Sequence, residues 1–236
     1  MWRLGKNKAI GNKVKLITVY FARSRNYKNF LTVWLKSAKK IMPNIDIKVI
    51  KPKQSKCIDH KRDTAIAFNE AAYYALKSKE PLIITDVDMM FMNPVDTILD
   101  RKFDIAITVR KYRAKYNTGL WIYKPSKRSR KFVHSWIQNT KWIVENFNKC
   151  TELIGTHGGI DQASLWMTIN KIQNINILEL PCQVWNACQT EWEKVDRHTK
   201  IIHVKSKLRL TATGRNEVPE NMQYLKPLIK KWRSYL

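Results

Sequence analysis

The sequence predicts an α/β protein built around a mainly parallel β-sheet flanked by helices. From residue 15 to residue 205, segments rich in β-branched and aromatic residues alternate with segments whose apolar residues recur at helical spacing. The 236 residues include only 7 Gly and 8 Pro, and no stretch has the composition of an interdomain linker. We therefore expect one domain over residues 1–236, with 206–236 as a C-terminal loop and helix appended to it.

The first half of the chain alternates between strand and helix signals. Residues 15–21 (KLITVYF) are β-branched and aromatic, which is typical of a buried strand, and residues 46–50 (DIKVI) indicate a second one. Residues 27–41 carry apolar side chains three and four positions apart and stop before a proline, so they predict a helix. The Ala-rich segment 64–78 is the strongest helix signal. An apolar strand that ends in acid follows at 81–91.

The second half continues this alternation. Further strands are expected at 103–109, 118–124, 175–181 and 200–205, and helices at 129–147 and 159–170. Residues 206–218 are polar and are expected to form a loop. Residues 219–236 predict an amphipathic helix with a basic face, which Pro227 should kink. A helix of this kind docks onto its own domain more often than onto a membrane.

The charge of the chain is strongly unbalanced. It holds 44 Lys and Arg against 19 Asp and Glu, which gives a formal net charge of +25. Residues 1–56 carry 15 basic and 1 acidic side chains, residues 101–131 carry 11 and 1, and residues 194–236 carry 11 and 3. This imbalance predicts a polyanionic partner: nucleic acid, anionic lipid or a diphosphate ligand. An A/T-rich coding bias is the alternative, but it would not deplete Glu.

Several common classes of protein are disfavoured by the sequence. No apolar run approaches the ~20 residues of a membrane span and the N-terminal residues lack the apolar stretch of a signal peptide, so the expected location is the cytoplasm. Four scattered cysteines indicate reduced thiols, and neither a P-loop nor a GxGxxG motif occurs. A zinc site made of Cys182, Cys188, His198 and His203 is disfavoured because the spacings between these residues are wrong.

Asp86 and Asp88 lie near the end of the apolar segment 81–91. Residues i and i+2 of a strand project from the same face, so we expect both carboxylates to point one way and Val87 to point into the core. Ligands of open α/β sheets bind outside the C-terminal ends of the strands. Two crowded carboxylates need a cation, and hard divalent cations take oxygen ligands. The pair therefore predicts a metal site, although aspartates also end strands and cap turns.

Three further motifs follow the acid pair along the chain. They are Asn117-Thr118-Gly119, the stretch GGIDQ at 158–162, and His203 followed by Lys205, Lys207 and Arg209. In this order and spacing, the sequence from residue 15 to about residue 209 resembles the nucleotide-diphospho-sugar transferases of the GT-A fold. The resemblance implies a metal-dependent enzyme that transfers a sugar from a nucleotide-diphosphate donor, with a UDP-sugar as the expected donor.

The resemblance also implies roles for particular residues. Those expected to bind the donor are Tyr20, Phe21, Ala22, Arg62, Asp86, Lys205 and Arg209. Those expected to hold the divalent ion are Asp86, Asp88 and His203. Those expected at the reaction centre are Asp161, Gln162 and Asn117, with Asp161 as the base. A bound Mn²⁺ or Mg²⁺ would stabilise charge on the departing diphosphate, and mixed oxygen and nitrogen ligands suit Mn²⁺ well.

Some features of the sequence depart from the family pattern or admit a structural explanation. In retaining galactosyl- and glucosyltransferases of this fold the last motif is His-x-x-Gly-x-x-Lys, whereas here Ser206 stands in place of the Gly and Arg209 in place of the Lys. Asp161 could instead be a helix N-cap, His203 a core histidine and Asn117 a turn residue.

The surplus of positive charge indicates a polyanionic acceptor. One diphosphate is neutralised by a metal and one or two cations, so most of the charge of +25 must face something else. The basic residues before Asn117 are Arg110, Lys111, Arg113 and Lys115, and the aromatic residues among and after them that could stack on bases are Tyr112, Tyr116 and Trp121. We therefore expect double-stranded DNA as the acceptor, glycosylated on hydroxymethylated pyrimidines of the kind that some bacteriophages carry, in the cytoplasm of a bacterial host.

Two alternative functions stay open. The first is transfer of a sugar to lipopolysaccharide, capsule or another surface glycan, with the basic helix at 219–236 resting on the inner face of the membrane. The second is a nucleic-acid-binding module on an inactive transferase scaffold. The intact set of Asp86, Asp88 and His203 argues against this second alternative.

Overall fold

The computed structural model describes residues 14–21, 25–52, 60–112, 114–189 and 191–236. The strands are β1 (Lys15–Val19), β2 (Asp46–Ile50), β3 (Leu82–Thr85), β4 (Met89–Phe91), β5 (Ile105–Val109), β6 (Tyr116–Tyr123), β7 (Ile177–Pro181) and β8 (Ile201–His203). The α-helices are α1 (Arg25–Ile41), α2 (His60–Lys77), α3 (Lys127–Glu145), α4 (Thr151–His157), α5 (Ile160–Lys171), α6 (Cys182–Trp185), α7 (Ser206–Ala212) and α8 (Leu225–Arg233). Short 3₁₀ turns are η1 (Asp96–Asp100), η2 (Phe147–Cys150), η3 (Trp192–Lys194) and η4 (Glu220–Met222).

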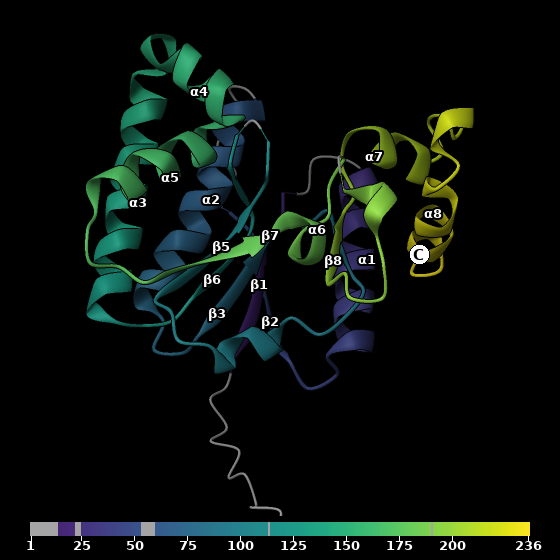
Figure 1. The fold of residues 1–236 in the computed structure, drawn as a ribbon, viewed down its shortest axis with the longest axis horizontal. Helices are drawn as coiled ribbons and strands as arrows, with labels where there is room; N and C mark the ends of the chain where they lie inside the picture. The colour runs from purple at the N-terminus through teal and green to yellow at the C-terminus, as the bar shows by residue number, and fades with distance from the viewer. Residues whose placement is uncertain (1–13, 22–24, 53–59, 113, 190) are drawn as a thin grey trace, which may run out of the picture.

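The centre of the molecule is a six-stranded sheet in the order β2-β1-β3-β6-β5-β7. β1 pairs in parallel with β2 and β3, β5 pairs in parallel with β7, and β6 runs antiparallel between β3 and β5. Helices lie on both sides of this sheet (Figure 1). The predicted α/β class, with a mainly parallel sheet flanked by helices, is confirmed.

The two faces of the sheet are covered by different elements. Because successive strand residues point to opposite faces, neighbouring residues of β1 enter different cores. Ile17 packs in a cluster with Phe68 of α2 and Trp136 of α3. Leu16 packs in a second cluster with Trp34 of α1 and with residues of β4 and β8. The second face is therefore closed by α1 together with a small two-stranded sheet.

The segment 81–91 differs from its predicted form. It is not one strand: β3 ends at Thr85, and β4 leaves the large sheet to pair antiparallel with β8, with Met89 opposite His203. Asp86 and Asp88 lie in the turn between the two strands, so the rule that places alternate strand residues on one face does not apply to them. Val87 is buried as predicted. The acid pair thus stands where the two sheets meet.

The C-terminal region also corrects two expectations. The predicted loop at 206–218 contains α7, which buries Leu208 against the domain. Pro227 does not kink a helix. It lies in the first turn of α8, where backbone N–H groups have no partner within the helix and proline is tolerated, so the helix begins there.

Helix α8 docks onto the rest of the protein, as predicted. Its buried side chains are Leu225, Leu228, Ile229 and Trp232, and they share a cluster with Phe30 of α1 and Ile202 of β8. No helix in the described parts of the chain has both the length and the apolar character needed to cross a membrane. Cys150, Cys182 and Cys188 are buried free thiols, as expected, and Cys57 lies outside the described residues.

Candidate functional site

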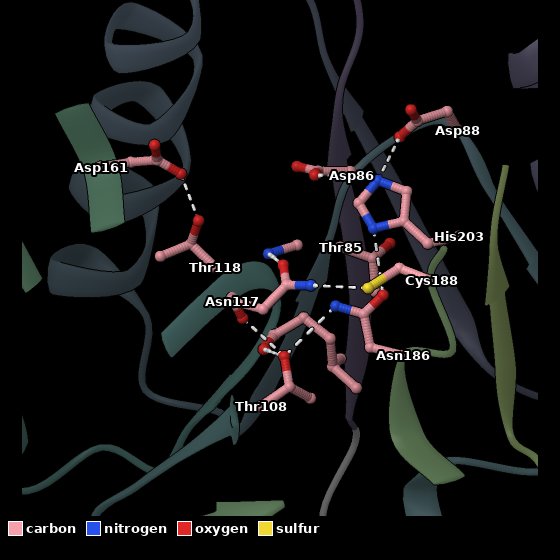
Figure 2. Close-up of polar contacts among 12 residues, drawn as sticks. Thr85, Asp86, Asp88, Thr108, Asn117, Thr118, Asp161, Asn186, Cys188 and His203 are labelled. Carbon is pink, nitrogen blue, oxygen red and sulfur yellow. Dashed lines mark hydrogen bonds and ion pairs between the residues drawn. The ribbon is translucent and has the colours of Figure 1, made fainter. Parts of the chain in front are cut away.

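Asp86, Asp88 and His203 come together at the end of β3, although they are far apart in the sequence. Each offers one ligand atom, and the three atoms all lie within 4.8 Å of one another. His203 Nε2 is 3.2 Å from Asp88 Oδ1 and 3.6 Å from Asp86 Oδ2. The pairing of β4 with β8 produces this meeting, because it places Met89 opposite His203. Figure 2 shows the imidazole facing the two carboxylates.

Asn186 fixes the orientation of the His203 ring. The hydroxyl of Thr108 donates to the Asn117 carbonyl at 2.5 Å and so accepts from Asn186 Nδ2 at 3.2 Å. This orients Asn186 Oδ1 toward His203 Nδ1, at 3.1 Å, and makes that nitrogen the N–H donor. In the neutral ring, Nε2 then carries a lone pair, and this lone pair faces the carboxylates of Asp86 and Asp88. Three acceptor groups that point at one space require a cation or a proton between them.

The charges at the site shift one another's pKa. Enclosure by protein and the carboxylates of Asp88 and Asp161 raise the pKa of Asp86 to about 7. The Asp86 side chain is still 54% exposed, so it forms the wall of an open cleft. Burial opposes ionisation of Asp88, but the hydrogen bonds and charges of His203 and Arg209 hold the pKa of Asp88 well below its usual range. Burial also lowers the pKa of His203, which favours the neutral, metal-binding form of its ring.

Two predicted phosphate-binding cations stand beside the cluster. Arg209 of α7 forms an ion pair with Asp88, and its guanidinium lies over the Phe30 ring at 5.2 Å. Arg209 Nε is buried and has no hydrogen-bond partner. Lys205 lies near enough to lower the pKa of Asp86 through its charge. Both residues are therefore placed where an anion bound at the cluster would meet them.

Ser206, at the start of α7, adopts the backbone conformation that glycine favours. Its φ is +48°, in the left-handed region that costs a residue with a Cβ roughly 1–2 kcal/mol. The sequence comparison placed Ser206 at the glycine of the His-x-x-Gly-x-x-Lys pattern. Ser206 thus adopts, at this position of the pattern, a backbone conformation that a glycine reaches without that cost.

Asp161 lies across a pocket from Asp86. The pocket is narrow, with a volume of about 60 Å³. Its lining residues are Val19, Phe68, Ala71, Ile84, Thr85, Asp86, Thr118, Trp121 and Asp161. The Asp161 carboxylate accepts a hydrogen bond from the hydroxyl of Thr118, and its backbone carbonyl accepts one from Trp136 Nε1. Thr118 had no role in the sequence prediction, although it belongs to one of the motifs.

Asn117 and Gln162, the other residues predicted at the reaction centre, hold neighbouring loops. Asn117 is 2% exposed; its Oδ1 accepts from the Gly119 N–H at 3.1 Å and its Nδ2 lies 3.8 Å from Cys188 Sγ. Gln162 Oε1 accepts from Arg110 Nη1 at 3.4 Å. Contact of either side chain with a sugar stays a prediction.

The residues predicted for the nucleoside end of the donor are only partly described. Tyr20 follows β1, and its N–H donates to the Ile50 carbonyl at 2.9 Å. Phe21 is half-buried beside it, and Ala22 lies outside the described residues. Arg62, near the start of α2, places its guanidinium 5.3 Å from the centre of the Phe147 ring. Their roles toward a donor stay predictions.

The structure bears on the structural alternatives that the sequence left open, while the catalytic and metal-binding roles stay predictions. The N-cap of α5 is Gly159, so Asp161 is not the capping residue. Asn117 lies within β6 and is not a turn residue. His203 is buried, yet it faces the acid pair and so is not merely a core histidine. His198 is exposed, and among the described His, Cys, Asp and Glu residues the cluster of Asp86, Asp88 and His203 is the group with metal-ligand geometry, which leaves the zinc alternative without support.

The turn that joins β5 to β6, residues 110–115, forms a basic tip near Gln162. The Arg110 N–H donates to the Lys115 carbonyl at 2.7 Å and closes the turn. Tyr112 at its end is 61% exposed, and Arg113 lies outside the described residues. Tyr116 and Trp121 are 9% and 1% exposed, so the expectation that they could stack on bases is wrong. They belong to β6, whose central position in the sheet buries them.

Comparisons with known proteins identify the fold. No model of a protein family matches the chain, and no curated protein does. Among solved structures, the crystal structure of a glycosyltransferase involved in the glycosylation of the major capsid of PBCV-1 matches with a TM-score of 0.60 at 10% sequence identity, over 83% of this chain and 94% of that chain. The chain therefore has a glycosyltransferase-like fold. On this fold, Asp86, Asp88 and His203 form a candidate site for a divalent metal ion.

Proposed function

We propose that this protein is a metal-dependent glycosyltransferase that moves a sugar from a nucleotide-diphosphate sugar to a hydroxyl group of a polyanionic acceptor. The donor we propose is a UDP-sugar, and the acceptor is hydroxymethylated pyrimidine in double-stranded DNA, within a bacterial host infected by a phage. The observation that carries the proposal is the convergence of three metal-ligand atoms within 4.8 Å, at the end of β3 on a glycosyltransferase-like fold.

The donor set fits a divalent ion on chemical grounds. Two carboxylates and one imidazole lone pair face the same space. The other ring nitrogen of His203 donates its N–H to Asn186 and is therefore not available as a ligand. A mixed set of oxygen and nitrogen suits Mn²⁺ better than Mg²⁺, which prefers oxygen alone. When bound, the ion would stabilise the negative charge that develops on the departing diphosphate.

Arg209 and Lys205 would hold the diphosphate itself. Arg209 pairs with one carboxylate oxygen of Asp88, and its side chain is 33% exposed, so a ligand can reach it. A guanidinium next to a bound nucleotide can donate to a phosphate oxygen in the fork geometry that arginine offers. Lys205, which precedes α7, adds a second positive charge near Asp86.

Asp161 would act as the base that removes the proton from the incoming hydroxyl. It lines the pocket that also contains Asp86, and its carboxylate is held by the Thr118 hydroxyl. The apolar floor of this pocket, formed by Phe68 and Trp121, would exclude water from the transferred sugar. Correct placement of the base beside the acceptor is worth about 10²–10⁴ in rate.

The proposal of a polyanionic acceptor rests on charge. Donor binding uses a few cations, whereas the chain has a net charge of +25. The basic β5–β6 tip, with exposed Lys111 and Tyr112, contacts Gln162 through Arg110, and Gln162 is one of the residues that we expect at the reaction centre. Cations with an exposed aromatic ring suit contact with a nucleic acid backbone and its bases.

A surface glycan is the second candidate acceptor. It is favoured by the solved glycosyltransferase of the same fold, which takes part in the glycosylation of a viral major capsid. The burial of the apolar side chains of α8 within the protein argues against insertion of this helix into a membrane. The two candidate acceptors can be distinguished with DNA, because only the first predicts that the protein transfers a sugar to it.

Metal binding gives the first test. Titration calorimetry with Mn²⁺ should show one site in the wild type and none in Asp88→Ala or His203→Ala, with thermal unfolding as the check that both variants fold. Mn²⁺ at about 100 times its Kd should stabilise the wild type by about 2.7 kcal/mol. Glu179→Ala, which removes an exposed carboxylate outside the cluster, is the matched control. Near-normal Mn²⁺ binding by either cluster variant would remove the metal assignment.

Transfer gives the second test. The protein is incubated with Mn²⁺, a panel of sugar nucleotides, and either plain or hydroxymethyl-pyrimidine DNA, and the nucleosides are then analysed by mass. The expected result is the gain of one sugar on the hydroxymethylated DNA alone, reduced about 10²–10⁴ in rate by Asp161→Asn. Mn²⁺-dependent donor hydrolysis without any gain on DNA would favour the glycan acceptor. Absence of donor hydrolysis would favour the non-enzymatic binding module.

A further inference from the structure

A groove away from the metal cluster lies between α7, the segment after it, and α8. Its volume is about 750 Å³, large enough for part of a polymer. Its lining residues are Thr211, Gly214, Arg215, Asn216, Glu217, Val218, Gln223, Lys226, Ile229, Lys230 and Arg233. In Figure 1 these elements lie on the opposite side of the molecule from α3. The groove is thus a second concave surface, separate from the pocket between Asp86 and Asp161.

The groove is lined by positive charge that the protein leaves uncompensated. Four cations line it against one carboxylate, that of Glu217, and in the described part of the chain none of the four lies within 4.0 Å of a carboxylate oxygen. Lys226, Lys230 and Arg233 lie at i, i+4 and i+7, so they form one row along α8, roughly 10 Å long. A row of cations in a groove attracts a linear array of anions.

Two contacts hold this groove in place. Arg233 Nη2 donates to the Thr211 carbonyl at 3.2 Å and ties α8 to α7. The buried side chains of α8, such as Ile229 and Trp232, anchor the helix to the domain, at about 1.5–3 kcal/mol for each large apolar side chain. The cations therefore stand on a packed scaffold.

The geometry favours nucleic acid over a lipid surface. A helix that binds a membrane inserts its apolar face into the headgroup region. The apolar face of α8 is already used for packing, since Leu225, Leu228 and Trp232 are at most 6% exposed. A concave groove also admits a polymer, whereas a flat layer of headgroups meets only its rim. Counterion release from the phosphates would supply the binding free energy.

We propose that the α7–α8 groove binds the sugar-phosphate backbone of double-stranded DNA and holds the acceptor polymer against the enzyme. Helix α7 links the two sites: Arg209, which pairs with Asp88, is two residues from Thr211, which lines the groove. This inference rests on the proposed function for the identity of the polymer as acceptor. The binding itself needs neither sugar donor nor metal.

The test measures how the full chain binds a short labelled DNA duplex, without donor or metal, over a range of salt concentrations. The groove variant is Lys226→Ala with Lys230→Ala. The control is Lys127→Ala with Lys131→Ala, two exposed lysines at the same i, i+4 spacing on α3. If each groove lysine neutralises one phosphate, the slope of log K against log salt falls by about 1.8 in the groove variant. The control should keep the wild-type slope.

Every outcome bears on the proposal. An equal fall in the slope in both double variants would mean that net charge alone drives binding. An unchanged slope in the groove variant would mean that DNA binds elsewhere on the protein. Either result overturns the proposal. So does a wild type that binds phosphatidylserine vesicles but not the duplex. If the double variant fails to fold, Arg215→Ala on the exposed loop repeats the test with one cation, for a fall of about 0.9. Groove binding without sugar transfer to DNA would instead count against the proposed function alone.

Discussion

The Nδ1 atom of His203 lies 3.1 Å from Oδ1 of Asn186, and this contact decides which nitrogen of the imidazole faces the acid pair. Asn186 is in turn oriented by Thr108, whose hydroxyl accepts from its amide at 3.2 Å. A histidine that binds a metal commonly donates its second N–H to a carbonyl or carboxylate oxygen, which fixes the ring and its tautomer. Asn186 therefore acts as a positioning residue for His203.

Replacement of Asn186 should weaken metal binding without removing any ligand. We expect Asn186→Ala to lower the affinity for Mn²⁺ by about 10–100-fold, the usual cost of losing such a supporting contact. Titration calorimetry measures the change. Asn93→Ala is a suitable control, because Asn93 also donates two amide hydrogen bonds, to the carbonyls of Arg197 and Thr199, outside the cluster. Equal Mn²⁺ affinity in the two variants would show that Asn186 has no positioning role.

Gly119 provides room for the cluster. A methyl group there would lie 2.8 Å from Met89 Cε, 2.9 Å from His203 Cε1 and 3.0 Å from Asp86 Oδ2, closer than side chains normally approach. We expect Gly119→Ala to destabilise the fold by about 1–3 kcal/mol, the cost of an overpacked core, and to reduce Mn²⁺ affinity by displacing a ligand. Denaturant unfolding and calorimetry measure the two effects.

Gly155→Ala is the matched control for that variant. Gly155 lies in α4, and nothing lies within 4 Å of the position that its Cβ would take. Alanine has a higher helix propensity than glycine, so this change should stabilise the protein by up to about 1 kcal/mol and leave metal binding unchanged. Wild-type Mn²⁺ affinity in Gly119→Ala would contradict the tight packing of Met89, Gly119 and His203.

Local patterns in the sequence were sufficient to predict most of the elements, and the resemblance to GT-A transferases named the three residues of the candidate metal cluster. The apolar runs and helical spacings gave the strands of the large sheet and α1, α2, α3 and α5, because those patterns report burial that each segment needs wherever it packs. The order of the motifs predicted that Asp88 and His203 lie at one site, and the structure places Asp88 Oδ1 3.2 Å from His203 Nε2.

Features that depend on contacts distant in sequence escaped prediction. After Pro81, no Gly or Pro in the run 82–91 marks its break. The break exists because β4 pairs with β8, which lies much later in the chain. Asn186 carries no motif, and its role follows only from its distance to His203. Trp121 was named among the aromatic residues that could stack on bases, but the sheet around β6 buries it.

Tyr112 is the aromatic residue of the basic tip that remains exposed, and it should stack on a base of the acceptor. Stacking on an aromatic ring is worth about 1–3 kcal/mol per base. We expect Tyr112→Ala to weaken binding of hydroxymethylated DNA about 5–150-fold, measured by fluorescence anisotropy, and Tyr112→Phe to retain it. Tyr73→Ala, which removes an exposed tyrosine from α2, should have no effect. Equal affinity for Tyr112→Ala and Tyr112→Phe would rule out stacking.

Asp104 should make the stability of the fold sensitive to acid. Its Oδ1 accepts from the Ser126 hydroxyl at 2.8 Å, and its Oδ2 accepts from the Asn176 N–H at 3.0 Å and from Arg128 Nε at 2.9 Å. Burial of the carboxylate opposes ionisation, but these bonds outweigh it and lower the pKa of Asp104 below its ordinary value of 3.8. The folded state thus binds the proton less tightly than the unfolded state does. The stabilisation is complete above about pH 5 and is lost as the pH falls below about 4.

Replacement of Asp104 should therefore cost more stability near neutral pH than in acid. We expect Asp104→Asn to lower the free energy of unfolding by about 1–2 kcal/mol near pH 7, since it weakens hydrogen bonds to a charged group. As the pH falls below about 4 toward 3, the wild type progressively loses this stabilisation, so the gap between the two proteins should narrow. Urea unfolding at both values measures this, with Asp100→Asn, an exposed carboxylate, expected to change stability by less than about 0.5 kcal/mol. A gap that stays constant between the two pH values would show that Asp104 acts through packing and not through its charge.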